Sequence, residues 1–477
     1  MASKKTLNVK NLESLGAARL AEFLMEASEG DAFTKRRLRL ELAGTESVDD
    51  VAHEIRKRLN TIKRAKSFID WEKVRAFAQD LEAQRRAIIE QVGKKEPETA
   101  LELLWQFMEV SNSVFERSDD SNGIIGDIFH EACDDIGKIA EATKPEAKAL
   151  ANRVFDSLNK NSYGQYDYLI ETLAPALGKK GLEHLKSCMI ELSKTPVEKP
   201  PKNERKVIGW GSGGEVYEDE MEEHCRESTV RIALLQIADA QGDVDSFIAQ
   251  YDEKTRKVPQ IAAEIAQRLL AAKRAEEALA VIDTAEHRRG WIPCEWKKIR
   301  LDVLDSLGRK DEAQKFRWAC FESDLDSSHL KNYLKALPDF EDFEAEEKAL
   351  DYARYFPNVH EALRFLISWP SLNRAANLVM TQADKLDGNF YELFSPAADA
   401  LEAKHPLAAT LVRRSMIDFS LDNQRSSRYH HAARHLLECE SLAASVPDFC
   451  SFETHDDYKA RLKEKHGRKS SFWKHLP

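Results

Sequence analysis

Apolar side chains recur every three or four positions through most of this chain, the spacing that places them on one face of an α-helix. The pattern is clearest between Thr229 and Ser323, where three stretches read IADAQGDVDSFIAQY, RLLAAKRAEEALAVID and LDSLGRKDEAQKFRWACF. Each stretch has an apolar first half, a short polar break and a second half that opens on acidic residues. The pattern therefore predicts pairs of helices joined by tight turns.

The polar breaks of these stretches lie at Gly242, at Lys273 and Arg274, and at Gly308 and Arg309. They recur at a period of about 34 residues, which is typical of helix–turn–helix repeats. One such unit cannot bury its apolar face alone, so consecutive units are expected to pack side by side. We therefore expect residues 219–477 to form an α-solenoid of helical hairpins resembling tetratricopeptide repeats.

Helical spacing also runs through the N-terminal part, for example in VDDVAHEIRKRLNTIKRA and in PETALELLWQFMEVSNSVFER. We interpret residues 1–194 as an N-terminal helical domain. Between the two helical regions, residues 195–218 are rich in proline and glycine and cannot sustain a helix, which indicates a linker. No convincing strand of any length is found, so the predicted fold class is all-α.

Composition agrees with this interpretation. In 477 residues, 42% hydrophobic and 32% charged, there are only 19 Gly and 15 Pro, which favours helix over sheet. The net charge of −11 argues against a dedicated nucleic-acid binder, whose contact surface is usually basic. The 7 Cys are scattered without a CxxC pair, as expected for free thiols in a reducing compartment. No signal-peptide core or membrane-length apolar run is found, so we expect a cytoplasmic protein without a membrane partner.

Between Gly209 and Tyr217 the sequence GWGSGGEVY matches the glycine-rich phosphate loop of protein kinases. That chemistry also needs a strand lysine, a catalytic loop and a metal-binding triplet. The following segment, TVRIALLQIAD, offers no such lysine, and neither HRD nor DFG occurs in the chain. We interpret the motif as part of a flexible linker.

The segment from Ser118 to Gly123 resembles half of a calcium loop, with Asp120, Asn122 and Gly123 at suitable positions. Ser118 and Phe129 stand where that loop needs an aspartate and a bidentate glutamate. The missing anionic ligands favour a capped turn between helices, with aspartate side chains accepting from backbone N–H groups.

His431, His435 and Cys439 follow one another at four-residue intervals, on one face of a single expected helix. This spacing suits two or three zinc ligands. Ala432 and Leu436 belong to the apolar stripe of the same helix, so we favour a hydrogen-bonded histidine at the edge of that stripe and a buried thiol over a metal site. No HExxH-like general base accompanies these residues.

Lysines and arginines gather in two stretches that could contact phosphates. The first comprises Lys35, Arg36, Arg37, Arg39, Arg56, Lys57, Arg58, Lys63, Arg64 and Lys66; the second comprises Lys459, Arg461, Lys463, Lys465, Arg468 and Lys469, followed by Phe472 and Trp473. Neighbouring aromatic residues could stack on bases. The alternative is a solvated helix face balanced by nearby acidic residues.

Several long phrases resemble a bacterial family known as domain of unknown function 6880. They are ERSDDSNGIIGDIF, YGQYDYLIETLAPALGKKGL, IADAQGDVDSFIAQYDEKTRKVPQIAAEIAQRLL and RYHHAARHLLECESLA. The resemblance covers nearly the whole chain and implies a helical fold without implying an activity. The C-terminal repeats are similar to those that follow SWIM-type zinc fingers, but the CxC…CxH ligand pattern is absent here, so the metal and nucleic-acid role of that finger is not implied.

The function that these observations favour is a non-enzymatic interaction or scaffold protein. The concave surface of a solenoid would bind a protein or peptide partner through side chains of successive repeats. A nucleic-acid-binding protein that uses residues 35–66 and 459–474 is the alternative, and a metal-binding protein that uses His431, His435 and Cys439 is a second one. We assign no catalytic, cofactor-binding or metal-ligating residue, and we expect no cofactor.

Overall fold

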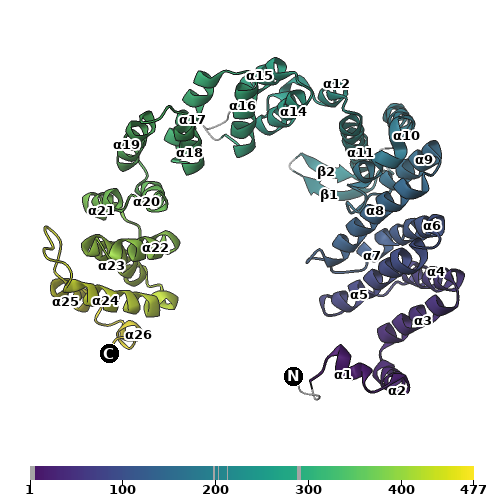
Figure 1. Ribbon diagram of the computed structural model, residues 1–477, viewed down its shortest axis with the longest axis horizontal. Coiled ribbons are helices and arrows are strands. Elements are labelled where there is room, and N and C mark those ends of the chain that lie inside the picture. Colours follow the sequence, from purple (N-terminus) through teal and green to yellow (C-terminus); the bar gives the residue numbers. More distant parts are fainter. Residues whose placement is uncertain (1–5, 197–198, 202–203, 212, 287–291) are drawn as a thin grey trace. The chain divides into compact units, whose positions relative to one another are not determined.

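The computed structural model describes residues 6–196, 199–201, 204–211, 213–286 and 292–477 (Figure 1). Helix follows helix throughout this part of the chain, and the predicted all-α class is confirmed. Two compact units are present, Met1–Arg256 and Lys257–Pro477. The predicted linker, 195–218, lies within the first unit, and its residues 197, 198, 202, 203 and 212 fall outside the described part.

The elements of the first unit are α1 Val9–Glu13, α2 Ala17–Ser28, α3 Ala32–Glu46, α4 Val48–Arg64, α5 Trp71–Ala87, the π-helix η1 Ile88–Gly93, α6 Pro97–Met108, α7 Ser111–Phe115, α8 Ile124–Thr143, α9 Ala147–Leu158, α10 Leu169–Lys194, β1 Val207–Gly211, β2 Gly214–Tyr217, α11 Glu218–Gln241, α12 Val244–Ile248 and α13 Glu253–Arg256.

The elements of the second unit are α14 Pro259–Ala271, α15 Ala275–Asp283, α16 Cys294–Ser306, α17 Lys310–Asp324, α18 Ser327–Lys335, α19 Glu341–Arg354, α20 Val359–Ser368, α21 Leu372–Thr381, the 3-10 helix η2 Ala383–Lys385, α22 Tyr391–Glu402, α23 Pro406–Asp422, the 3-10 helix η3 Ser426–Arg428, α24 Tyr429–Ala443, α25 His455–His466 and α26 Ser470–Trp473.

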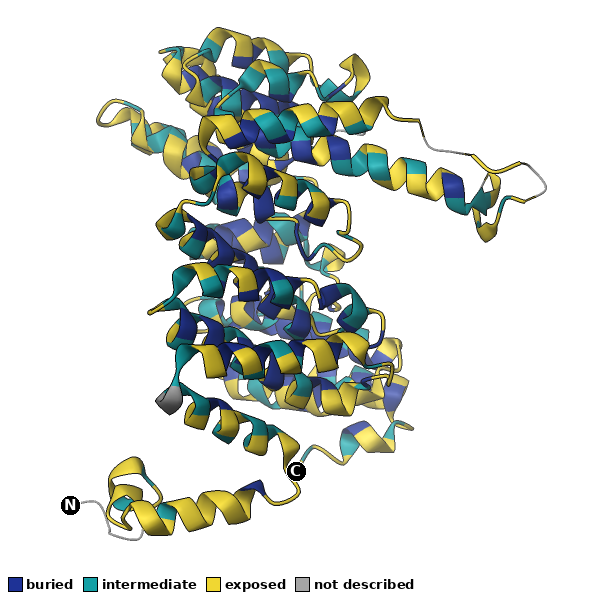
Figure 2. Ribbon diagram, turned by 90° about the vertical axis from the view of Figure 1, so that its right-hand side faces the viewer, coloured by how far each residue is buried: buried dark blue, intermediate teal, exposed yellow. Residues whose placement is uncertain are grey.

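The core of the first unit runs from α3 to α11, and the helices bury one face and expose the other (Figure 2). Phe107 of α6 and Phe129 of α8 are fully buried, with ring centroids 5.3 Å apart. Helix α8 also packs closely on α10, because a Cβ atom at Gly137 would lie 2.3 Å from Thr172 Cγ2. By contrast, α1 and α2 are exposed almost throughout.

The repeated polar breaks form the turns that their sequence predicts. Gly242, Lys273 and Gly308 all adopt left-handed backbone conformations, with φ of 66°, 61° and 69°. Each lies between two helices in contact: α11 and α12, α14 and α15, and α16 and α17. A left-handed residue after a helix ends it and redirects the chain, so the three predicted helical pairs are present.

In the second unit, each helix contacts its next one or two neighbours along the chain. Helix α23 is buried on nearly all sides, and Arg413 within it is only 2% exposed. Its guanidinium binds Asp399 at 3.1 Å, Glu402 at 2.5 Å and Glu438 at 2.9 Å. These ion pairs tie α22, α23 and α24 together. Within the described residues, no helix is long and apolar enough to cross a membrane.

The expectation that no strand occurs is wrong for the glycine-rich segment. There β1 and β2 pair in an antiparallel hairpin, with Trp210 opposite Glu215 and Gly211 opposite Gly214. Valine, isoleucine, tryptophan and tyrosine favour extended backbone, and Gly214, at the start of β2, has a φ of 118°, a conformation that glycine adopts readily. At the base of the hairpin, Arg205 lies 4.0 Å from the centre of the Tyr217 ring.

Candidate functional site

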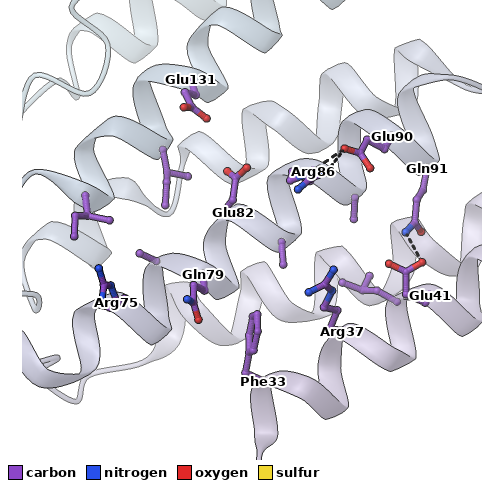
Figure 3. A pocket seen from close by; sticks show the side chains of 16 residues that line it. Phe33, Arg37, Glu41, Arg75, Gln79, Glu82, Arg86, Glu90, Gln91 and Glu131 are labelled. Atoms are coloured by element: carbon purple, nitrogen blue, oxygen red, sulfur yellow. Dashed lines mark hydrogen bonds and ion pairs between the residues drawn. The ribbon is translucent and has the colours of Figure 1, made fainter. Parts of the chain in front are cut away.

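An open groove of about 730 Å³ lies in the first unit between α3, α5, η1 and the start of α8 (Figure 3). Its apolar floor is made of Phe33, Leu40, Ala78, Ala83, Ala87, Ile124 and Ile128. Small alanines on α5 leave the space open, because a larger side chain at those positions would fill it. The result is an elongated apolar surface inside a polar rim.

The rim of the groove carries positively and negatively charged side chains. Arginines Arg37, Arg75 and Arg86 and carboxylates Glu41, Glu82, Glu90 and Glu131 stand around the floor (Figure 3). Arg86 pairs with Glu90 at 2.8 Å, and hydrogen bonding to that carboxylate raises the pKa of Arg86. For the exposed Arg37 and Arg75, no ion pair is found among the described residues. These two cations are therefore available to an incoming carboxylate.

A buried carboxylate fixes the distance between the two long walls of the groove. Asp80 of α5, whose side chain is 3% exposed, accepts hydrogen bonds from Arg36 of α3 at 2.9 Å and from Arg58 of α4. An unpaired buried carboxylate would be strongly unfavourable, so both arginines hold α3 and α4 against α5. The structure thus explains two residues of the first basic stretch as structural ones.

A second charge network joins α5 to α8 at the other edge. Arg85 binds Glu82 at 2.8 Å and Glu131 at 2.5 Å, and it also binds Asp135. Burial opposes the charge of Arg85, but hydrogen bonds and attraction from Glu82 and Asp135 raise its pKa above the ordinary value. The guanidinium therefore stays charged and holds two of the rim carboxylates in place.

The π-helix η1 forms one end of the groove and carries Glu90 and Gln91. Short π-helical segments are rare and occur frequently at functional sites. Gln91 donates to Glu41 of α3 at 3.5 Å across the groove, whereas its own Oε1 is buried without a partner within the described part of the chain. This irregular turn presents polar groups that a regular α-helix would direct elsewhere.

The remaining residues of the first basic stretch are exposed or half-buried. Lys57 pairs with Glu54 at 3.4 Å and Lys63 with Glu109 at 3.1 Å, while Arg37 belongs to the groove. Five of the ten residues are thus assigned to internal ion pairs, surface ion pairs or the groove rim, and for the other five no ion pair is found among the described residues. Nucleic-acid binding by these residues stays a prediction.

Half of the basic residues in the second stretch form ion pairs. Lys459 binds Glu440 at 3.1 Å, Arg461 binds Glu453 at 2.9 Å and Lys465 binds Asp422 at 2.7 Å. Phe472 is fully buried, and the indole N–H of Trp473 donates to His466 O at 2.9 Å. Phe472 is therefore packed inside the protein instead of being exposed for base stacking.

The structure does not bring His431, His435 and Cys439 together as a set of ligands. His431 is exposed, His435 is buried with Nδ1 2.9 Å from a carboxylate oxygen of Glu438, and Cys439 donates weakly to Thr410 O at 3.9 Å. Burial raises the pKa of Cys439 to about 12, which opposes the thiolate form that a metal binds. Among the described residues, no cluster of three or more ligating side chains is suited to a metal ion.

The segment from Ser118 to Gly123 forms the predicted capped turn. Asp120 Oδ1 accepts from Ile125 N and Oδ2 from Gly126 N, both at 2.9 Å. These two bonds satisfy N–H groups in the first turn of α8. The kinase-like motif, whose Ser212 is outside the described residues, lies in the β1–β2 hairpin with Trp210 exposed.

The groove was not predicted from the sequence. Its residues come from segments that are distant along the chain, and its polar rim looks like an ordinary solvated face when α5 is considered alone. The sequence does contain one usable signal: Phe33, Arg37 and Leu40 share one face of α3, and an arginine is unusual between two apolar positions of one face. That mixed face marks a surface with both apolar and charged contacts.

A model of a protein family matches residues 2–475 and is described as a family of unknown function, DUF6880. The chain belongs to this family. A search of the curated proteins finds no match. Family membership agrees with the resemblance seen in the sequence and covers nearly the whole chain, including the groove. It assigns no activity to any of these residues.

Proposed function

We propose that this protein is a non-enzymatic interaction protein whose first unit binds a partner peptide in the groove between α3 and α5. The observation that carries the proposal is an apolar floor beside the exposed Arg37 and Arg75. Apolar side chains of a partner would bury against the floor, and neighbouring carboxylates would pair with the two arginines. The expected ligand is an amphipathic helix with acidic residues beside its apolar stripe.

We further propose that the helical pairs continue as a tetratricopeptide-like α-solenoid. Contacts of each helix with its nearest neighbours along the chain support this, since repeat proteins pack in that way. A cytoplasmic location is part of the same proposal. All seven cysteines are free, as expected in a reducing compartment.

The proposal is tested with a library of displayed helical peptides selected on the full-length protein. Affinities of the selected peptides are then measured by fluorescence anisotropy for wild type, Ala83→Glu and Ala76→Glu. Ala83 lies on the groove floor, whereas Ala76 is exposed on the same helix and does not line the groove. The two variants therefore add the same charge to α5 at different places.

We expect Ala83→Glu to weaken binding by about tenfold or more, because a carboxylate on an apolar floor must be desolvated when a peptide covers it. Ala76→Glu should bind like the wild type, and binding should weaken as salt screens the two arginines. Equal affinity of both variants, or no enrichment of any peptide, would contradict the proposal.

A further inference from the structure

A second, smaller cavity of about 270 Å³ lies in the second unit between α22, α23 and the start of α24. It includes two of the histidines that the sequence analysis considered as metal ligands, His431 and His435. Backbone packing closes one side, because Gly388 lies so near α23 that a Cβ atom there would be 2.0 Å from Ser415 O. The cavity is therefore built into the fold. The two histidines that line it are not part of a metal-binding cluster, since no such cluster is found among the described residues.

The lining of this cavity is cationic. Arg428 and Arg434 contribute guanidinium groups, and no aspartate or glutamate is among the described lining residues. Outside the lining, Glu438 binds Arg413 and His435 at 2.9 Å and Arg434 at 3.4 Å. In a chain with a net charge of −11, an acid-free cavity with two arginines is a notable local excess of positive charge.

Hydrogen-bond donors and the helix dipole add to this charge. Ser395, Ser420 and Ser427 line the cavity. The Ser420 hydroxyl donates to Met416 O at 2.7 Å and the Ser395 hydroxyl to Met416 Sδ at 3.8 Å, whereas for the Ser427 hydroxyl no hydrogen bond is found among the described residues. The cavity lies at the N-terminal turn of the 15-residue helix α24, where the helix dipole favours an anion. Burial, together with the charges of His430 and Arg434, lowers the pKa of His431, so its neutral ring can donate one N–H at pH 7.

Both arginines of the cavity keep N–H groups that are available to a ligand. Arg428 donates one bond to Asn389 Oδ1 at 3.0 Å and lies 4.6 Å from the centre of the Tyr391 ring. Arg434, whose side chain is 60% exposed, contacts Glu438 at 3.4 Å, and no other ion pair of Arg434 is found among the described residues. Since a guanidinium has five N–H donors, both can still bind an oxyanion. Met416 and Tyr391 supply apolar surface beside them.

We propose that this cavity binds the phosphate monoester of a small molecule. Two guanidinium groups and the Ser427 hydroxyl can donate to the oxygen atoms of a tetrahedral dianion. The apolar side, formed by Met416 and the Tyr391 ring, accommodates a small organic group attached to the phosphate. This site is independent of the groove in the first unit, so either proposal can fail without the other.

The test is a titration of the full-length protein with phenyl phosphate, followed by broadening of the ligand's ³¹P resonance and by calorimetry. Inorganic phosphate is titrated in parallel to measure the contribution of the phenyl group. The decisive pair of variants is Ser427→Glu and Ser427→Gln. Ser427 is exposed, so both variants should fold, and they differ only in the charge placed at the cavity.

We expect saturable binding of phenyl phosphate to wild type and Ser427→Gln, and no binding to Ser427→Glu. Arg434→Gln should weaken the affinity by about tenfold, the effect of one lost charge-assisted bond. The matched control is Arg468→Gln, which removes an exposed arginine of the same unit outside this cavity. Absence of saturable binding to wild type, or unchanged binding to Ser427→Glu, would overturn the proposal.

Discussion

At the scale of single residues, buried charged side chains explain more of the contacts between helices than charged side chains on the surface do. Asp80 joins α5 to both α3 and α4, and Arg413 joins α23 to α22 and α24. In both places one nearly inaccessible group is compensated by two or more partners of opposite charge. The sequence does not identify such groups, because Asp80 stands in an ordinary charged helix and Arg413 has another arginine beside it.

Replacing Asp80 with asparagine should lower the free energy of unfolding by about 2–4 kcal/mol, because Arg36 and Arg58 lose their buried counter-charge. Urea denaturation of the full-length protein measures this change. The control is Glu22→Gln, which breaks the exposed Arg19–Glu22 pair of α2 and should cost about 0–1 kcal/mol. Similar losses in both variants would show that Asp80 has no special structural role.

Thiol reactivity tests the environment of α24. Because burial raises the pKa of Cys439 to about 12, its thiolate fraction at pH 8 is very small, and the side chain is also inaccessible. We expect iodoacetamide to modify the exposed Cys225 much faster than Cys439 in the native protein, and both at similar rates in urea. Peptide mass spectrometry quantifies the two sites; fast native modification of Cys439 would contradict its placement.

At the scale of elements, the sequence predicts where helices begin and end better than it predicts which helix faces pack against one another. The turns at Gly242, Lys273 and Gly308 follow from local residue types, since a polar break after an apolar helical half ends the helix. The β1–β2 hairpin was missed because its glycines obscured a short β-forming run. The π-helix η1 packs against α4, α5 and α6, and the groove forms between α3, α5, η1 and α8, so neither can be specified by a local sequence pattern.

Close packing between α8 and α10 gives a prediction at this scale. Gly137→Ala should destabilise the protein by about 1–3 kcal/mol, because its Cβ would overlap Thr172. Gly126→Ala on the same helix is the matched control, since its nearest neighbour, Asp120 Oδ2, would be 3.6 Å away. That variant should be neutral or slightly stabilising, as alanine favours helix. Thermal unfolding distinguishes them, and equal melting temperatures would contradict the packing argument.

At the scale of the whole molecule, the all-α class and the family could be predicted from the sequence, while the groove in the first unit could not. The prediction placed recognition on the repeats of residues 219–477. The groove that carries the proposed function lies instead among residues 33–131 of the first unit. The repeats are easy to recognise because their signal is local, and the groove is not, because distant helices assemble it.

The most direct test of the groove is hydrogen–deuterium exchange of the full-length protein with and without a helical peptide selected on the wild type. Binding should slow exchange in α3, α5 and η1, because a bound helix covers these elements and suppresses their local opening. The same peptide should leave exchange in residues 257–477 unchanged. Protection confined to other elements, with α3 and α5 unaffected, would contradict the account.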